Sequence, residues 1–182
     1  DDMPFLVDSV TGALVQAGID IHLIIHPQLI VVRDAVGELK SVENRDITKS
    51  FRSGAVGELA ESWMLLSIDR EGDEEQRAEL ERTIRSVLED VRQSVEDWPK
   101  MRSRCLVLAA ELEGNAPPDA DPDEVALTTR FLRWMADNHF TFLGYREYTL
   151  DRTPDGEVIS PVTGSGLGLL RADPPLGAPA EV

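Results

Sequence analysis

The segment from Glu74 to Val95 constrains the fold of this chain more than any other feature. Its aliphatic residues recur every three or four positions, so they share one side of a helix, and charged residues fill the opposite side. The aliphatic stripe consists of Leu80, Ile84, Val87, Leu88, Val91 and Val95. Such a helix must bury its stripe against another layer, and the preceding chain is rich in strand-forming Ile, Leu and Val. The sequence therefore predicts a helix packed on a β-sheet.

A shorter amphipathic helix is predicted near the start of the chain. Apolar residues recur at three- and four-residue spacing between Pro4 and Ala17. Asp2 is placed to cap this helix, Pro4 suits its first turn, and Gly18 is placed to stop it. We expect both helices to face the same antiparallel sheet.

The strands of this sheet are predicted between the two helices. Residues 19–33 are rich in Ile, Leu and Val, are interrupted by Pro27, and are followed by the turn-forming residues 34–37, which favours a strand pair or bent hairpin. Residues 61–69 are typical of a buried strand. Between these segments, residues 43–58 combine charges with two glycines and predict a disordered loop.

Helix-breaking residues divide the chain after the long stripe. Trp98-Pro99 is expected to end the long helix, and a further helix is predicted over residues 101–112. The Gly, Asn and Pro residues in 114–119 predict a linker. Residues 121–124, Asp-Pro-Asp-Glu, combine an N-cap, a first-turn proline and an acid three residues after the cap. A helix should therefore run from there to about Asn138.

The last part of the chain predicts a strand followed by irregular structure. Residues 140–150 alternate and are rich in aromatic residues, as in a strand, and residues 154–156 form a turn into residues 157–159. The chain from Gly164 onward is rich in Gly and Pro, and we expect it to be loose. The sequence Gly-Ser-Gly-Leu-Gly at 164–168 lacks the following helix of a dinucleotide-binding loop and the Lys-Ser/Thr ending of a P-loop, so it predicts a flexible loop.

Charge and cysteine content limit the partners and the compartment. Acidic residues outnumber basic ones 34 to 18, which gives a net charge of −16 and a pI near 4.5. This charge repels phosphate backbones and anionic lipids, so neither nucleic acid nor a membrane surface is an expected partner. The apolar runs are too short for a membrane span, and the acidic start is unlike a signal peptide. The single cysteine, Cys105, excludes an internal disulfide and fits a reducing compartment, so we expect a cytoplasmic protein. Its neighbours Leu106, Val107 and Leu108 predict a buried, inert thiol.

The residue types that carry chemistry form no recognisable catalytic or metal site. His22 and His26 lie at an even separation on a predicted strand, but a metal would need a third ligand such as His139, and the usual zinc spacings are absent. We therefore expect structural histidines, although binding would depend on pH if they faced a ligand pocket. Ser9 and Ser62 lie in no nucleophile motif. No catalytic, cofactor-binding or metal-binding residue is predicted in this chain.

The opening segment Asp2-Met3-Pro4-Phe5-Leu6-Val7-Asp8-Ser9-Val10 is the most informative. Backbone amides at the start of a helix can hold a carboxylate, because the positive end of the helix dipole lies behind them. The segment resembles the signature Asp-x-Pro-Gly-Leu-Leu-x-x-(Ile/Val) of ACT domains, small βαββαβ modules that bind amino acids and regulate metabolic enzymes. The Gly position holds Phe5, whose side chain would occupy the space that a ligand uses. Two interpretations stay open: effector binding, or packing against neighbouring domains alone.

Other strings extend a family resemblance over roughly residues 1–171. They are Ile21-His22-Leu23-Ile24-Ile25-His26-Pro27, Asn138-His139-Phe140-Thr141-Phe142-Leu143-Gly144-Tyr145-Arg146-Glu147-Tyr148 and Gly164-Ser165-Gly166-Leu167-Gly168-Leu169-Leu170. Together with the opening segment they resemble the amino-terminal region of the large bacterial NAD-dependent glutamate dehydrogenases. These enzymes oxidise L-glutamate to 2-oxoglutarate and ammonium with NAD and carry ACT-like modules ahead of a distant catalytic domain. The resemblance implies a regulatory or assembly module that is not itself an enzyme, with NAD bound elsewhere in the parent protein.

The resemblance also implies a fold. We expect an α+β structure of the ferredoxin-like ACT type, a βαββαβ antiparallel sheet with two packed helices, plus a helical extension and a closing strand. The expected division is an ACT-like domain at 1–113, a linker at 114–121, a helix-plus-strand extension at 122–171 that could complete the sheet, and a flexible tail at 172–182. The chain starts after the first strand of such a module. That strand could come from residues outside this sequence, from residues 140–148, or from a second molecule.

The implied partners are an amino-acid effector, other domains of the parent chain, and further copies in a homo-oligomer. The effector carboxylate would meet the amides after Met3, and the implied effector-binding residues are Met3, Pro4, Phe5, Leu6, Asp8 and His22. The first alternative is a protein-interaction or oligomerisation module without a ligand. A stand-alone enzyme is a more distant alternative. The chain begins without Met, and we interpret it as a fragment of a longer protein.

Overall fold

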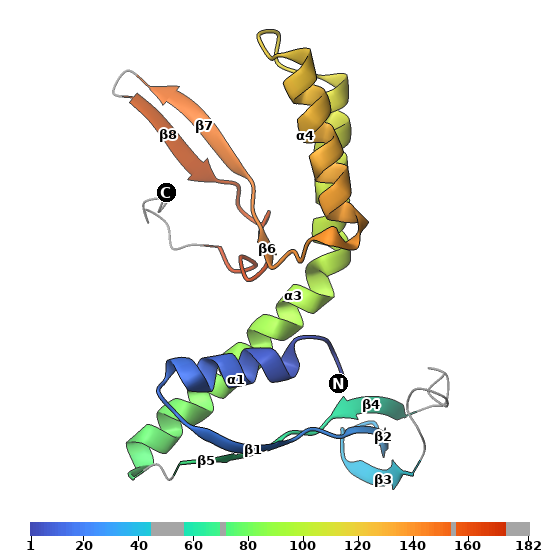
Figure 1. The fold of residues 1–182 in the computed structure, drawn as a ribbon, viewed down its shortest axis with the longest axis vertical. Helices are drawn as coiled ribbons and strands as arrows, with labels where there is room; N and C mark the ends of the chain where they lie inside the picture. The colour runs from blue at the N-terminus through green and yellow to red at the C-terminus, as the bar shows by residue number, and fades with distance from the viewer. Residues whose placement is uncertain (45–56, 70–71, 154–155, 174–182) are drawn as a thin grey trace. The chain divides into compact units, whose positions relative to one another are not determined.

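The computed structural model describes residues 1–44, 57–69, 72–153 and 156–173. Two compact units make up the chain, Asp1–Val91 and Arg92–Val182, and each is described by itself. The structure mixes helices with antiparallel strands (Figure 1), so the expected α+β class is confirmed.

Several predicted features lie outside the residues that the structure describes. These are most of the loop expected at 43–58, the turn at 154–155 and the tail from residue 174. The domain division expected at residues 113 and 122 stays a prediction. The boundary between the two compact units falls elsewhere, inside the long helix α3 (Glu74–Gly114).

The first helix of unit 1, α1 (Leu6–Gln16), stops where the sequence predicts. Gly18 has φ 76°, and its N–H donates to the Val15 carbonyl at 3.0 Å. The Ile19 N–H donates to the Leu14 carbonyl, also at 3.0 Å. This pair of bonds is a Schellman motif, which requires the left-handed conformation that glycine adopts freely.

The predicted N-cap of α1 is wrong. Phe5 directly precedes the helix, and Asp2 lies too far back along the chain to reach the first helical amides. The Asp2 carboxylate instead accepts hydrogen bonds from Ser62 Oγ and from Gln28 Nε2, the latter at 2.9 Å. The Asp2 N–H donates to the Ala60 carbonyl at 2.8 Å. Asp2 therefore ties the chain before α1 to two β-strands.

In the part of unit 1 that the structure describes, five strands form a β-layer. They are β1 (Ile21–Ile25), β2 (Gln28–Arg33), β3 (Leu39–Glu43), β4 (Glu58–Ser62) and β5 (Leu65–Ile68). β1 pairs with β5, β2 lies between β3 and β4, and each of these pairings is antiparallel. Ile25 faces Leu65 and Gln28 faces Ser62, so one register continues across the interruption at Pro27.

The strands agree with the prediction at the hairpin and differ from it at residues 61–69. The hairpin after Arg33 is confirmed, with Gly37 at φ 84° in the turn between β2 and β3. The single strand expected over 61–69 is split between β4 and β5, opposite the point where Pro27 interrupts the partner strand. Leu65 is 62% exposed, so this part of the chain is not buried on both faces.

The hydrophobic core of unit 1 joins its helices to one face of the β1–β5 sheet. Val10 and Leu14 of α1, together with Ile19, form its centre. The partly buried residues packed against this centre are Ile21, Met64, Leu66, Ile68, Leu80, Ile84 and Val87. Figure 1 shows α1 and the start of α3 lying over β1 and β5. The predicted packing of a helix on a sheet is therefore confirmed for the first part of α3.

The helix break expected at Trp98-Pro99 is wrong. α3 continues through Pro99, although a proline inside a helix removes one hydrogen bond and costs about 3 kcal/mol. The turns around Pro99 carry Asp97 and Met101, each 1% exposed. The buried Ser94 also lies there, and its hydroxyl donates to the Leu143 carbonyl at 3.2 Å. These tertiary contacts within unit 2 offset the proline.

The next helix, α4 (Pro122–Trp134), begins as predicted. The Asp121 carboxylate accepts the Asp123 N–H at 2.9 Å, and Pro122 occupies the first turn. α4 continues into the π-helical turn η1 (Met135–His139), where Asn138 has φ 58°. The helical run therefore ends close to the predicted Asn138, because a left-handed residue cannot continue it.

The described residues of unit 2 also form two small antiparallel strand pairs. β6 (Gly144–Tyr145) pairs with β9 (Leu167–Gly168), and β7 (Tyr148–Thr153) pairs with β8 (Gly156–Pro161). The closing strand expected over 140–150 is therefore shorter than predicted and is interrupted between β6 and β7.

The loose, flexible loop expected at 164–168 is wrong. Gly168 belongs to β9, and the Leu169 N–H donates to the Leu143 carbonyl at 2.9 Å. A Cβ atom added at Gly168 would overlap the Leu143 carbonyl oxygen, and one added at Gly166 would overlap that of Leu170. These glycines permit close backbone packing rather than mobility.

Among the described residues of unit 1, the order of elements is one helix, five strands and a second helix. This order supports an α+β module with antiparallel pairing and two helices. The finer βαββαβ arrangement, and the origin of its first strand, stay predictions. Over the described ranges, no helix is both long and apolar enough to cross a membrane.

Candidate functional site

The residues Met3–Leu6, predicted to bind an effector, form the turn that begins α1. Phe5 has φ 71°, a left-handed conformation that costs a residue other than glycine about 1–2 kcal/mol. The position that the ACT signature gives to glycine therefore keeps a glycine-like backbone while it carries phenylalanine. The Phe5 side chain is 46% exposed, whereas Leu6 is buried in unit 1.

This turn presents backbone donors to its surroundings. The first amides of any α-helix have no partner inside the helix, and no side chain in the described part of the chain caps α1. Asp8 lies exposed in the first turn of α1. The positive end of the helix dipole lies at this turn, so the geometry suits a small anionic group such as a carboxylate.

The structure separates His22 from this turn. His22 follows the far end of α1, which has 11 residues and is about 16 Å long. Its Nε2 atom lies 2.8 Å from Asp69 Oδ1, so this side chain already has a partner. Met3–Leu6 and Asp8 are thus brought together at one end of α1, and His22 is not.

The second histidine of the predicted pair has different surroundings. His26 is half-buried, and its Nε2 atom has no hydrogen-bond partner among the residues described. A register shift between Ile21 and Leu23 interrupts the alternation that would place both histidines on one face of β1. The two side chains therefore do not form a common ligand site.

The remaining sequence candidates have structural contacts. Ser62 Oγ donates to the Asp2 carboxylate, and the buried Cys105 thiol donates to the Leu132 carbonyl at 3.3 Å. Burial raises the pKa of Cys105, which keeps the thiol protonated and agrees with the predicted inert character. Within residues 1–44, 57–69, 72–153 and 156–173, no group of three or more His, Cys, Asp or Glu is arranged to hold a metal ion.

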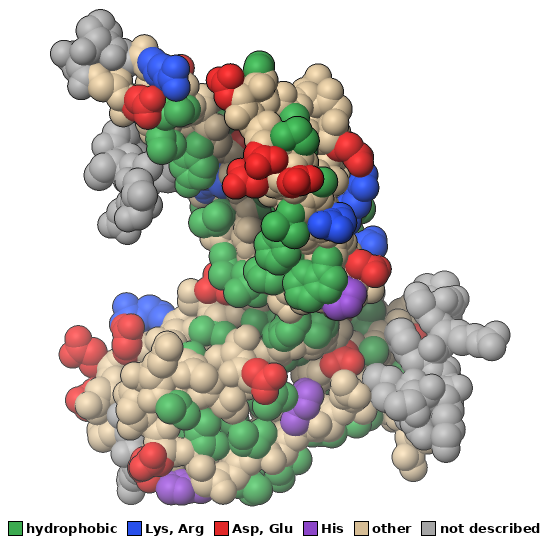
Figure 2. All heavy atoms as spheres, turned by 45° about the horizontal axis from the view of Figure 1, so that its top comes forward, with side chains coloured by type: hydrophobic (Ala, Val, Ile, Leu, Met, Phe, Trp, Pro, Cys, Tyr) green, Lys and Arg blue, Asp and Glu red, His purple; other side chains and the backbone are tan. Residues whose placement is uncertain are grey.

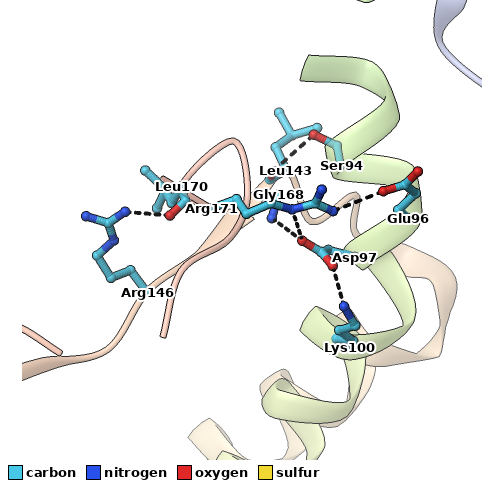
Figure 3. A network of polar contacts seen from close by, with 9 residues as sticks. All are labelled: Ser94, Glu96, Asp97, Lys100, Leu143, Arg146, Gly168, Leu170 and Arg171. Carbon is cyan, nitrogen blue, oxygen red and sulfur yellow. Dashed lines mark hydrogen bonds and ion pairs between the residues drawn. The ribbon is translucent and has the colours of Figure 1, made fainter. Parts of the chain in front are cut away.

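A polar cluster in unit 2 surrounds the buried Asp97 carboxylate. Asp97 Oδ1 accepts from Lys100 Nζ at 2.8 Å, and Oδ2 accepts from the Gly168 N–H at 3.0 Å and from Arg171 Nε at 2.9 Å. Arg171 Nη2 also lies 3.2 Å from Glu96 Oε2. Figure 3 shows the side chains of α3 meeting the 168–171 segment at this point.

The charge of Asp97 is stabilised by these donors. Burial alone raises the pKa of Asp97, but the hydrogen bonds from Lys100, the Gly168 N–H and Arg171 outweigh burial, and the net pKa lies well below its usual range. Both carboxylate oxygens are engaged and the residue is 1% exposed. The cluster therefore fastens the 168–171 segment to α3 and leaves no open position for a ligand.

Sequence reasoning missed the Asp97 cluster. Asp97 lies 71 and 74 residues from the partners that the tertiary fold brings to it, Gly168 and Arg171. The local pattern shows only one more acidic residue on a helix rich in acids, so no sequence signal distinguishes it. The same holds for Arg33 and Glu61 in unit 1, whose atoms Nε and Oε1 lie 2.5 Å apart.

The Arg33–Glu61 pair is linked to an aromatic residue. Trp63 Nε1 and Arg33 Nη2 each donate to Glu61 Oε2 at 2.9 Å. The hydrogen bonds from Arg33 outweigh desolvation and lower the pKa of Glu61 to about 2. Glu61 is therefore charged at neutral pH, and Arg33 neutralises its charge locally.

An aromatic surface covers part of unit 2. Phe131 and Trp134 of α4 stack with ring centroids 6.0 Å apart, and Trp134 stacks on His139 at 4.8 Å. Phe131, Trp134 and Phe140 are each about half exposed. Figure 2 shows hydrophobic side chains grouped on the surface that α4 and η1 form. Exposed apolar side chains of this kind are typical of surfaces that contact another domain or subunit.

The helices α1 and α3 and the antiparallel strands of unit 1, with an acid–x–Pro turn at the start of α1, are compatible with an ACT-like domain. Residues 1–84 match the family model described as "Glutamate dehydrogenase, ACT1 domain". The resemblance to this family that the sequence gives is therefore confirmed, and the family model covers residues 1–84 of the 182.

Curated relatives extend the similarity beyond the ACT1 match. The chain is 34% identical to the NAD-specific glutamate dehydrogenase of Halomonas elongata over 96% of its residues, and 37% identical to that of Pseudomonas aeruginosa over 93%. It is 32% identical to the Mycobacterium tuberculosis protein of the same name over 91%. The chain spans 10% of the length of each relative. No solved structure matches the chain.

Proposed function

We propose that this chain is the amino-terminal regulatory or assembly module of a long NAD-dependent glutamate dehydrogenase. The whole protein would convert L-glutamate to 2-oxoglutarate and ammonium with NAD in the cytoplasm, and its NAD site and catalytic residues would lie outside residues 1–182. The observation that carries this proposal is the combined match to an ACT1 domain and to NAD-specific glutamate dehydrogenases ten times as long.

We further propose that an amino-acid effector binds at the start of α1. Its carboxylate would accept hydrogen bonds from the first amides of α1, with Met3–Leu6 and Asp8 around it. The uncapped turn and the left-handed Phe5 support this placement. His22 is a less suitable partner, because it lies beyond the other end of α1 and contacts Asp69.

The test uses initial rates of glutamate-dependent NADH formation by the full-length protein in the presence of a panel of amino acids. Phe5→Gly removes the side chain over the turn, so an effector should act at a lower concentration. Phe5→Asp adds a negative charge beside the same amides, so the effector should act only at a higher concentration. An effector response that neither variant changes would place the binding site elsewhere.

The competing function is a protein-interaction or oligomerisation module without a ligand. The exposed aromatic surface of α4 and η1 favours it. On this alternative, rates would not respond to any amino acid, and removal of the surface by Phe131→Ser with Trp134→Ser would lower the oligomeric state of the full-length protein in sedimentation experiments. Thr128→Ser, an exposed change on the same helix, is the control.

A further inference from the structure

One face of the unit 1 β-layer carries apolar side chains that nothing in the described chain covers. From Trp63 to Asp69 exposure alternates strictly, with Met64, Leu66 and Ile68 turned toward the core and the residues between them exposed. Leu65 is 62% exposed, its cross-strand partner Ile25 is 47% exposed, and Leu23 is 52% exposed. These three residues and Trp63 form what we call the outer sheet face. It lies opposite the face that α1 and α3 cover.

The four residues of the outer sheet face are apolar and carry no charge. At one end of the face, Trp63 donates to Glu61, which is paired with Arg33, and at the other end Oδ1 of the exposed Asp69 lies 2.8 Å from His22 Nε2. The four uncharged residues contrast with the net charge of −16 on the whole chain. A contiguous exposed cluster of uncharged Leu, Ile and Trp side chains is typical of a docking surface.

The charge of the chain and the length of its relatives together indicate which partner binds the outer sheet face. A second copy would also carry a net charge of −16, and the long-range repulsion between two chains of like charge opposes their association. The relatives are ten times as long as this chain, so most of the proposed protein lies outside residues 1–182. A domain tethered on the same polypeptide also has a high effective concentration and needs no separate association step.

We infer that the outer sheet face docks on an apolar, weakly charged surface of another domain of the same polypeptide. This inference rests on the proposed function, because it requires the long parent protein. The contact joins the module to the rest of the enzyme and gives a physical route by which a ligand at α1 would act on distant domains, since α1 packs on the opposite side of the same two strands.

The test is thiol protection in the full-length protein. Ser67→Cys is close in size, and Ser67 is an exposed residue between Leu66 and Ile68 on the outer sheet face, opposite Leu23. Ser86→Cys is the matched control on the exposed side of α3 in unit 1. Modification by a neutral maleimide is followed at each site by peptide mass spectrometry, in native protein and in urea, at high protein concentration and after dilution to single protomers.

We expect the thiol of the Ser67→Cys variant to react at least about tenfold more slowly in native protein than in urea, equally before and after dilution. The thiol of the Ser86→Cys control should react at nearly its urea rate. A fast reaction of the native Ser67→Cys variant would overturn the inference.

Two other outcomes would also overturn it. Protection lost on dilution would assign the outer sheet face to a second copy, and equal protection of the control thiol would show that protection is not specific to this face. If Ser67→Cys fails to fold, Leu65→Cys replaces it.

Glutamate-dependent NADH formation, measured on the same samples, separates the two proposals. An active enzyme in which the Ser67→Cys thiol reacts fast would refute the docking surface and leave the proposed function standing. A protein that forms no NADH from glutamate and NAD would refute the proposed function itself.

Discussion

At the scale of single residues, Phe5 holds a conformation that its side chain disfavours. Phe5→Gly should raise the free energy of unfolding of unit 1 by about 0.5–1 kcal/mol, because glycine adopts φ 71° without the left-handed penalty. Phe5→Ala removes the same ring but keeps Cβ, so it should give no gain. Chemical denaturation of the three proteins measures the difference. Equal stability of the Gly and Ala variants would contradict the argument.

Asp97 is a buried carboxylate that fastens the 168–171 segment to α3 in unit 2. Asp97→Asn keeps the shape but removes the charge that Lys100, Gly168 and Arg171 stabilise, and should lower stability by about 1–3 kcal/mol. Glu96→Gln removes only the exposed partner of Arg171 and should cost less than about 1 kcal/mol. Hydrogen exchange of the β6 and β9 amides measures the loss of stability in both variants. A loss for Glu96→Gln as large as that for Asp97→Asn would refute a specific role for the buried carboxylate.

At the scale of elements, glycine has opposite roles in α1 and β9. Gly168→Ala should destabilise unit 2 by more than about 2 kcal/mol, because Gly168 has φ 59° and a Cβ would meet the Leu143 carbonyl. Gly12→Ala should stabilise unit 1 by about 0.5–1 kcal/mol, because Gly12 is in the interior of α1 and its Cβ would meet nothing. Thermal unfolding of each variant tests the signs, and a stabilising Gly168→Ala would show that the β9 packing is wrong.

The elements also separate what the sequence can predict from what it cannot. The first part of the stripe (Leu80, Ile84 and Val87), the Gly18 stop and the Asp121 cap were predictable, because each depends on residues within one or two turns, whereas Leu88 of the predicted stripe is exposed. The helix through Pro99 and the ordered loop at 164–168 were not, since both depend on contacts between Ser94 or Asp97 and residues far along the chain. For the candidate site, the opening motif identified the turn at α1. The separation of His22 from this turn could not be predicted, because it depends on where β1 begins.

At the scale of the whole molecule, the excess negative charge and two stabilised carboxylates have opposite effects on the free energy of unfolding as pH falls. Protonation of ordinary carboxylates below pH 7 reduces the self-repulsion of a chain with charge −16 and pI near 4.5, so stability should rise toward about pH 5. Glu61 in unit 1 and Asp97 in unit 2 have folded pKa values below their unfolded values, Glu61 near 2. Their contribution is complete above the unfolded pKa of about 4 and is lost as pH falls through the folded pKa.

Stability should therefore pass through a maximum between about pH 4.5 and 5.5 and then fall steeply toward pH 2. Denaturant unfolding at a series of pH values, followed by hydrogen exchange in each unit, provides the measurement. We call the fall of stability toward pH 2 the acid limb. Glu61→Gln should make this fall less steep in unit 1 only, and Asp97→Asn should do so in unit 2 only, because the two carboxylates lie in different units. Added salt should lower the rise between pH 7 and 5 and leave the acid limb nearly unchanged, since exposed charges are screened and paired, buried carboxylates are screened much less. An acid limb that persists in both variants would assign the loss of stability to other carboxylates.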